Sequence, residues 1–233
     1  MLVAVFSDAH ANLEALTAVL TTAEARGAEA LVCLGDVVGY GPDPAACVEL
    51  LRARALPTVL GNHDVAVATG EGLNALPRDG HTAALLHRRL LTEEQRAWLG
   101  ALPLRLNAYG AVYVHASPDE PAAWHRLDGF RAVRAQFAAF EGPLCFVGHS
   151  HRPAVVADRV GVLRVRPGHR FLVDVGSVGQ PRDGDPRAAF ALYDSAAFTC
   201  EIVRVPYDVE ATAEKIRAAG LPHGLADRLR KGR

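Results

Sequence analysis

The sequence predicts an α/β protein, and three observations support this prediction. Short apolar runs typical of strands alternate with segments of helical periodicity along the first part of the chain. Polar residues gather directly after several of these runs, where the loops of an α/β sheet converge. The second half is richer in strand-like runs with short connections, which favours an antiparallel or mixed sheet.

The first half of the chain reads as repeated strand, loop and helix units. A strand over residues 2–6 is followed by a helix in which Leu13, Leu16 and Leu20 recur at helical spacing. A second strand over 30–34 is followed by a glycine- and proline-rich loop and a helix over 44–54. A third, shorter strand is expected over 58–60.

Residues 65–103 change character and predict a helical, cap-like segment beside the site. The strands then resume, and a helical region follows Pro206. We expect one domain over residues 1–233, because a chain of this length, with 50% hydrophobic residues, can bury one large core. The strands predicted in the second half are 111–115, 144–147, 154–156, 162–165, 171–175, 188–193 and 198–205.

Charge and composition exclude several classes of function. The formal net charge is -1, so no overall basic field attracts nucleic acid or acidic membranes, and strong nucleic-acid binding is not expected. Lysine occurs only at Lys215 and Lys231, which argues against Schiff-base and P-loop chemistry. The chain starts directly in a strand-like run and no segment approaches a membrane span, so we expect a cytoplasmic protein without a membrane partner.

Five polar motifs stand at the ends of predicted strands. Alternate residues of an extended segment point the same way, so both members of a D-x-H or H-x-H pair can face one pocket. Histidine and carboxylate together suit Zn, Mn or Fe, whereas a calcium site would need more oxygen ligands. In order, the motifs are Asp8-Ala9-His10, Gly35-Asp36, Gly61-Asn62-His63-Asp64, His115 and Gly148-His149-Ser150-His151.

This motif series resembles that of the calcineurin-like metallophosphoesterase superfamily, namely D-x-H, G-D, G-N-H-[DE], H and G-H-x-H. The segments 35–44 and 176–182 are similar to those of a bacterial subfamily of small phosphodiesterases within it, so the resemblance covers nearly the whole chain. It implies a four-layer α-β-β-α sandwich with two central mixed sheets. One departure is Ala11, where relatives commonly carry glycine, and its methyl group restricts positive φ at that turn.

The resemblance also implies a site with two divalent metal ions, Mn foremost, with Fe, Zn or Ni as alternatives. A bridging hydroxide would attack phosphorus in line, and His63 would be the general acid that donates a proton to the leaving oxygen. Asp36 would bridge the two ions. One ion would be held by Asp8, His10, Asp36 and His151, and the other by Asp36, Asn62, His115 and His149.

Three further residues are candidates for binding a small phosphorylated or nucleotide substrate. Arg182 and Arg187 lie in a glycine- and proline-rich loop, where guanidinium groups can clamp a phosphate, or form ordinary surface ion pairs. Tyr40, in the loop after Asp36, can stack on a base, cover the site or simply pack. The sequence does not determine the oligomeric state.

The expected reaction is hydrolysis of phosphodiester or phosphoanhydride bonds, with phosphodiesters and dinucleoside polyphosphates as the leading substrates. Alternatives are a phosphomonoesterase, a protein phosphatase or a nuclease of the same superfamily, although a nuclease would need a long basic groove. A non-catalytic scaffold would normally have replaced ligand positions, and none is replaced here. A serine hydrolase at Ser150 is disfavoured because Arg152 occupies the last glycine position of G-x-S-x-G.

Overall fold

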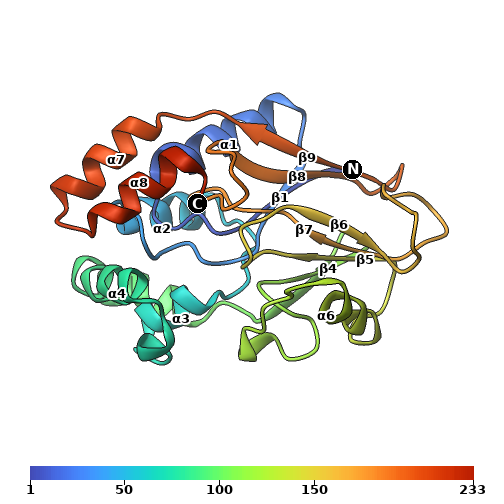
Figure 1. Ribbon diagram of the computed structural model, residues 1–233, viewed down its shortest axis with the longest axis horizontal. Coiled ribbons are helices and arrows are strands. Elements are labelled where there is room, and N and C mark those ends of the chain that lie inside the picture. Colours follow the sequence, from blue (N-terminus) through green and yellow to red (C-terminus); the bar gives the residue numbers. More distant parts are fainter.

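Two β-sheets lie face to face at the centre of the protein, and helices cover their outer faces (Figure 1). The computed structural model describes residues 1–233. Both sheets contain parallel and antiparallel pairs, so the predicted four-layer sandwich with two mixed sheets is confirmed.

The first sheet has the strand order β2-β1-β8-β9. Both faces of β1 are buried, which explains its continuous apolar sequence: Val3 and Val5 face the second sheet, whereas Ala4 and Phe6 face the helices. β1 pairs in parallel with β2 and antiparallel with β8. The strands are β1 (Leu2–Phe6), β2 (Ala30–Cys33), β8 (Ala188–Asp194) and β9 (Thr199–Val205).

The second sheet has the order β3-β4-β5-β7-β6, with β4, β5 and β7 parallel to one another. Tyr113 and Phe146 stack with ring centroids 5.5 Å apart and pack against Tyr193 of the first sheet, which closes the space between the sheets. The strands are β3 (Arg105–Ala108), β4 (Ala111–Val114), β5 (Leu144–Val147), β6 (Ala154–Ala157) and β7 (Phe171–Asp174).

One helix on each outer face completes the four layers. Helix α1 (Leu13–Ala25) buries Leu16, Val19 and Leu20 on the first sheet, and its N-cap Asn12 accepts a hydrogen bond from the Ala15 amide. On the other side, α6 (Phe130–Ala135) and the 3-10 turn η3 (Gln136–Ala138) cover the second sheet.

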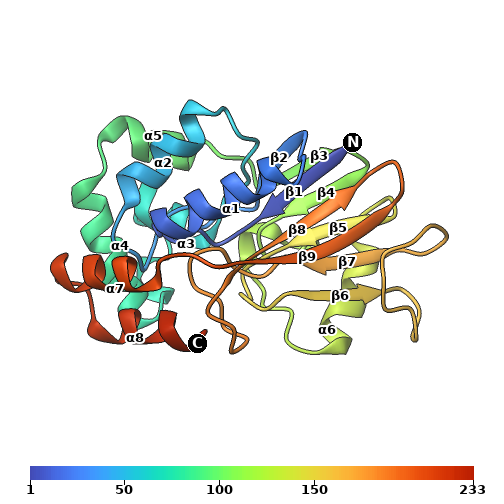
Figure 2. The same cartoon turned by 90° about the horizontal axis from the view of Figure 1, so that it is seen from above.

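Six further α-helices lie beyond one end of the sheets (Figure 2): α2 (Pro44–Ala53), α3 (Asn62–Ala68), α4 (Arg78–Leu90), α5 (Glu93–Gly100), α7 (Val209–Ala218) and α8 (His223–Lys231). Helices α4, α7 and α8 share a small apolar core of their own. No helix is long and apolar enough to span a lipid bilayer. Residues 65–103 contain most of α3 together with η1, α4 and α5, and the role of this segment as a cap stays a prediction. The two other 3-10 turns are η1 (Leu73–Ala75) and η2 (Pro121–Ala123).

Three details of the strand prediction were wrong. Residues 162–165 form no strand: Leu163 is 83% exposed, and the run finds no backbone partner although Val165 packs between the sheets. Residues 58–60 form only one bridge to β2 before the chain turns into α3. Strand β3 was missed because its polar residues weaken the apolar pattern, yet it pairs with β4 through a turn at Tyr109-Gly110, both at positive φ.

Candidate metal centre

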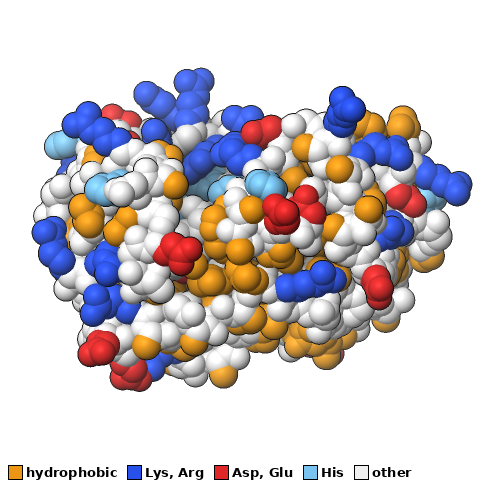
Figure 3. Space-filling view, turned by 90° about the horizontal axis from the view of Figure 1, so that it is seen from below, with side chains coloured by type: hydrophobic (Ala, Val, Ile, Leu, Met, Phe, Trp, Pro, Cys, Tyr) orange, Lys and Arg blue, Asp and Glu red, His pale blue; other side chains and the backbone are white.

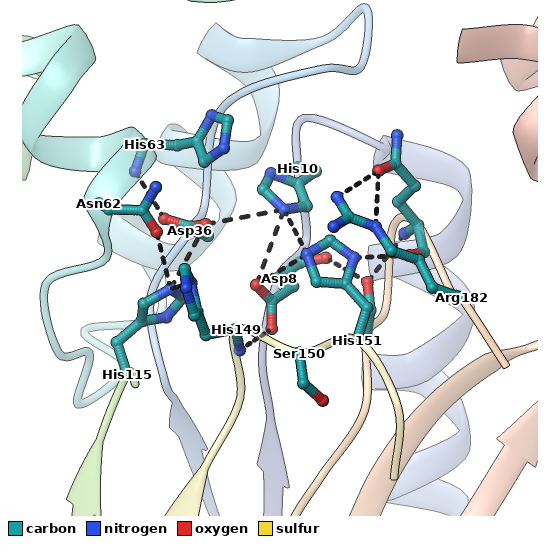
Figure 4. A network of polar contacts seen from close by, with 12 residues as sticks. Asp8, His10, Asp36, Asn62, His63, His115, His149, Ser150, His151 and Arg182 are labelled. Carbon is teal, nitrogen blue, oxygen red and sulfur yellow. Dashed lines mark hydrogen bonds and ion pairs between the residues drawn. The ribbon is translucent and has the colours of Figure 1, made fainter. Parts of the chain in front are cut away.

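The carboxyl ends of four strands place the predicted ligands together at one end of the two sheets. Asp8 and His10 follow β1, Asp36 follows β2, His115 follows β4, and the 149–151 pair follows β5. Asn62 opens helix α3 and reaches the same point (Figure 4). A hydrogen bond links the loops that follow β1 and β5 here, since the His149 amide donates to the Asp8 carboxylate oxygen Oδ2 at 3.0 Å.

Three of these side chains form the first ligand group: Asp8, His10 and His151. The two Nε2 atoms lie 3.2 Å apart, and Asp8 Oδ1 lies 3.7 Å from His10 Nε2 and 3.4 Å from His151 Nε2. A triangle with these edges has a centre about 2 Å from each corner, which is the length of a bond from Zn²⁺ or a similar cation to nitrogen or oxygen. Asp8 Oδ1 is also buried without a hydrogen-bond partner, so the group fits a cation.

The second ligand group consists of Asp36, His115 and His149. His115 Nε2 lies 3.2 Å from both Asn62 Oδ1 and His149 Nδ1, and 3.4 Å from Asp36 Oδ2. Asp36 Oδ2 is also 3.7 Å from His10 Nε2, so this one oxygen borders both groups (Figure 4). The structure therefore brings the candidate ligands together, with Asp36 between the two groups.

Hydrogen bonds to carbonyl oxygens fix the tautomers of three histidines. Nδ1 of His10 donates to Val38 O at 2.9 Å, Nδ1 of His151 to Gln180 O at 2.6 Å, and Nδ1 of His115 to Leu34 O at 2.8 Å. In a neutral imidazole held this way, Nε2 carries a lone pair, and the lone pairs of His10 and His151 both point into the first ligand group. Lone pairs that converge at such distances repel one another unless a cation lies between them, and a second hydrogen bond of this kind is typical of metal-binding histidines.

The pKa values favour a cation at the same place. Burial lowers the pKa of His10 and of His151 well below the usual value, which leaves both rings neutral. Burial opposes ionisation of Asp36, but the nearby His115 and His63 outweigh it and hold the pKa of Asp36 well below its usual range. Burial by itself would lower the pKa of His115. The negative charge of Asp36 outweighs this effect and raises the pKa of His115 to about 10. A positive charge beside Asp36 is therefore strongly favoured.

The loops that carry these ligands hold unusual backbone conformations. Non-glycine residues at positive φ concentrate here, and most of them are ligands or their direct neighbours. Such conformations cost about 1 kcal/mol or more each, so the surrounding structure must hold them, as is common at functional sites. Ala11 has a φ of 51°, so the methyl group restricts this turn but does not prevent it. The site residues concerned are Asp8, His10, Ala11, Asp36, Tyr40, His149 and His151.

His63 lies beside both groups without being part of either. Its backbone amide donates to Asp36 Oδ1 at 2.8 Å, and its ring meets His10 edge-on at 4.9 Å. Nδ1 is buried without a partner and faces Gly39, where an added Cβ would lie only 2.5 Å away, so the Nε2 side of the ring borders the cavity. Burial lowers the pKa of His63 to about 4.

A cavity of about 760 Å³ opens over the site, large enough for one small ligand. Figure 3 shows histidine side chains in a hollow of the surface, with basic side chains on one side and hydrophobic side chains on the other. The lining includes Asp36, Asn62, His63, His149 and His151, so five of the eight predicted metal-binding and catalytic residues reach the cavity.

The three predicted substrate contacts differ in position. Arg182 lines the cavity, with its guanidinium 5.6 Å from the centre of the Tyr40 ring and bonded to Gln180 Oε1 at 2.7 Å. Tyr40 also lines the cavity, but it is only 4% exposed and packs against Arg182, His10 and His63, so little of its ring is free to stack on a base. Arg187 does not line the cavity. It forms a surface ion pair with Asp185, which is one of the two roles that the sequence allowed for it.

Sequence reasoning missed several residues that support or border the site. His87, which matched no motif, is fully buried; its Nδ1 accepts from the Gly39 amide and its Nε2 donates to Gly41 O, so it holds the loop on both sides of Tyr40. Trp124 and Arg126 line the cavity beside the second ligand group, with Trp124 edge-on to His115 at 5.9 Å. No spacing in the sequence marks these three.

Asp64 and Ser150 lie inside motifs, but their roles are structural. Asp64 accepts from the Val38 and Gly61 amides and so ties the loops after β2 and before α3 together. Its place in Gly61-Asn62-His63-Asp64 was the available signal. The Ser150 hydroxyl donates to Asp174 at 2.6 Å and meets no histidine, which gives no support to a serine nucleophile.

The family of the protein follows from this fold and from a direct comparison. Residues 1–197 match the family model of the calcineurin-like phosphoesterase superfamily domain, and the protein belongs to that superfamily. The superfamily uses divalent metals, which agrees with the two ligand groups, and membership supports a hydrolase of phosphoric esters.

Relatives match from end to end. An uncharacterised protein of Methanocaldococcus jannaschii is 38% identical, with 100% of this chain and 98% of that protein covered. A metallophosphoesterase structure from Sphaerobacter thermophilus is 36% identical, with a TM-score of 0.88 over 100% of this chain and 99% of the other. A hypothetical protein from Pyrococcus horikoshii, 23% identical, shares the fold with a TM-score of 0.85 over 100% and 98%.

Proposed function

We propose that this protein hydrolyses phosphodiester or phosphoanhydride bonds of small molecules with two divalent cations. The observation that carries the proposal is the pair of ligand groups that share Asp36 Oδ2 at the floor of a cavity. When bound, two such cations lower the pKa of a water to supply the nucleophile and neutralise charge on the phosphate oxygens. The histidine and carboxylate set suits Mn, with Fe, Zn or Ni as alternatives.

The chain itself would position the substrate and supply a proton. Arg182 borders the cavity beside His151 and can hold a phosphate oxygen, since a guanidinium matches phosphate geometry. His63 would donate a proton from Nε2 to the leaving oxygen. Burial keeps this ring neutral in the free protein, and a phosphate anion beside it would favour the imidazolium and raise its pKa.

The test begins with protein stripped of metal and reloaded separately with Mn, Fe, Ni or Zn. Hydrolysis of bis(p-nitrophenyl) phosphate, p-nitrophenyl phosphate and diadenosine tetraphosphate would then separate diesterase, monoesterase and anhydride hydrolase activity. Asp36→Asn should lower kcat/KM by at least about a hundred-fold, because the shared oxygen would be replaced by a weaker ligand. A matched control is Asp227→Asn, a surface aspartate paired with Arg230. No metal-restored turnover on any substrate would favour a scaffold.

A further inference from the structure

The cavity has two walls of different chemistry. One, here called the apolar wall, consists of Leu60, Val65, Leu76 and Leu104. These residues come from the segment around α3 and from the chain after α5, and the Leu60 amide donates to Pro103 O at 2.8 Å, which holds the two parts together. The other wall carries Trp124 and Arg126 from the segment at η2.

The apolar wall lacks any group that would bind an anion. Arg126 and Arg182 are the only arginines that line the cavity, no lysine lines it, and both arginines come from other segments. Glu71 also lines the cavity, and it stands five residues before Leu76 of this wall in the sequence. Its side chain is exposed and negative. A phosphate or carboxylate placed there would gain no partner and would be repelled.

His63 lines the same cavity as this wall and lies on α3, the helix that also carries Val65. A proton donor must lie within hydrogen-bond reach of the oxygen that leaves, so the leaving group lies on the His63 side of the phosphorus.

We propose that the apolar wall binds the leaving group, and that the preferred substrate carries an uncharged, apolar alkyl or aryl group there. This inference rests on the proposed phosphoesterase function. Burial of apolar surface would supply binding energy on this side, whereas charge on the remaining part of the substrate would be met by Arg126 and Arg182. Extended polyphosphate leaving groups are disfavoured.

The experiment measures binding, by isothermal titration calorimetry, of n-alkylphosphonates from methyl to hexyl to the Mn²⁺-loaded protein. Full burial of a methylene strengthens binding about four-fold, and because the cavity is open to solvent we expect about two-fold per methylene. Hexylphosphonate should also bind more tightly than 5-carboxypentylphosphonate, whose second charge would meet Glu71. Leu76→Ala and Leu104→Ala should each reduce the gain per methylene, whereas Leu90→Ala, a 51% exposed leucine outside the cavity, should not.

Other results would overturn the inference. Affinity that does not change with chain length, or tighter binding of the carboxylate ligand, would show that the wall does not select apolar groups. If the increase in affinity per methylene stays the same in both leucine variants but disappears in Trp124→Ala, the alkyl chain binds to the wall that carries Trp124 and Arg126. If methylphosphonate binds and metal-dependent turnover is present, such results count against the apolar wall alone. Failure of every phosphonate to bind, without turnover, would count against the proposed function as well.

Discussion

Replacing His87 with glutamine should remove a specific part of the protein's sensitivity to acid. His87 is fully buried between Gly39 and Gly41, and burial lowers its pKa from 6.5 to about 4. Between these two values the unfolded chain binds more protons at this position than the folded protein does. Stability from this group is therefore present above pH 6.5 and is lost as pH falls toward 4.

The magnitude follows from the two pKa values. Acidification from pH 7.5 to 5.0 should cost about 2 kcal/mol of unfolding free energy through His87 alone. Glutamine has one donor and one acceptor that can replace the bonds to Gly39 and Gly41, but it does not titrate. The assay is urea denaturation of metal-free protein at both pH values, with the difference compared between wild type and His87→Gln. All other histidines remain in both proteins, so their contributions cancel.

The control is His125→Gln, because the His125 side chain is 53% exposed. It should retain the wild-type dependence on pH. Equal losses of stability in wild type and His87→Gln would refute the reasoning, because they would mean that His87 accepts a proton in the folded protein as readily as in the unfolded chain.

Three further predictions concern the site. His63→Ala should retain metal, as measured by elemental analysis, but should slow turnover most for substrates with poor leaving groups. An equal loss of rate for aryl and alkyl esters would indicate that His63 positions the substrate instead. Gly39→Ala should lower the melting temperature more than Gly27→Ala. Both glycines have positive φ, but only a methyl group at position 39 would meet His63, 2.5 Å away. Equal shifts in the melting temperature would argue against this contact. Arg182→Ala should raise KM at least ten-fold, with Arg182→Lys recovering only part because lysine cannot bind two oxygens with a planar fork; an unchanged KM would remove Arg182 from substrate binding.

Local patterns predicted the parts of the fold that depend on neighbours in sequence. The run Leu2–Phe6 is apolar at every position, which is typical of a strand buried on both faces, and the structure buries its two sets of alternate residues in different cores. Strand β3 is the counterexample. Its sequence is only weakly strand-like, and it forms because β4 lies next to it across a two-residue turn.

The candidate ligands were found in the sequence because their residue types and spacings are local. Asp8 and His10, or His149 and His151, are close in the chain, and strand ends are known meeting points for such residues. The sequence could not reveal that His87 supports the Tyr40 loop from 46 or more residues away, because a lone histidine in a helix has no distinguishing pattern. The same is true of Trp124, which meets His115 only in space.

The sequence by itself determined the α/β class, the order of the main elements and the candidate metal ligands. Only the tertiary structure decided that Arg182 borders the cavity while Arg187 pairs with Asp185, that Tyr40 is packed rather than open, and that one wall of the cavity is apolar. The physical reason is that the patterns of strands and of candidate ligands depend on residues that are close together in the sequence. The charge and shape of a cavity instead arise from segments that meet only when both sheets have closed around the core.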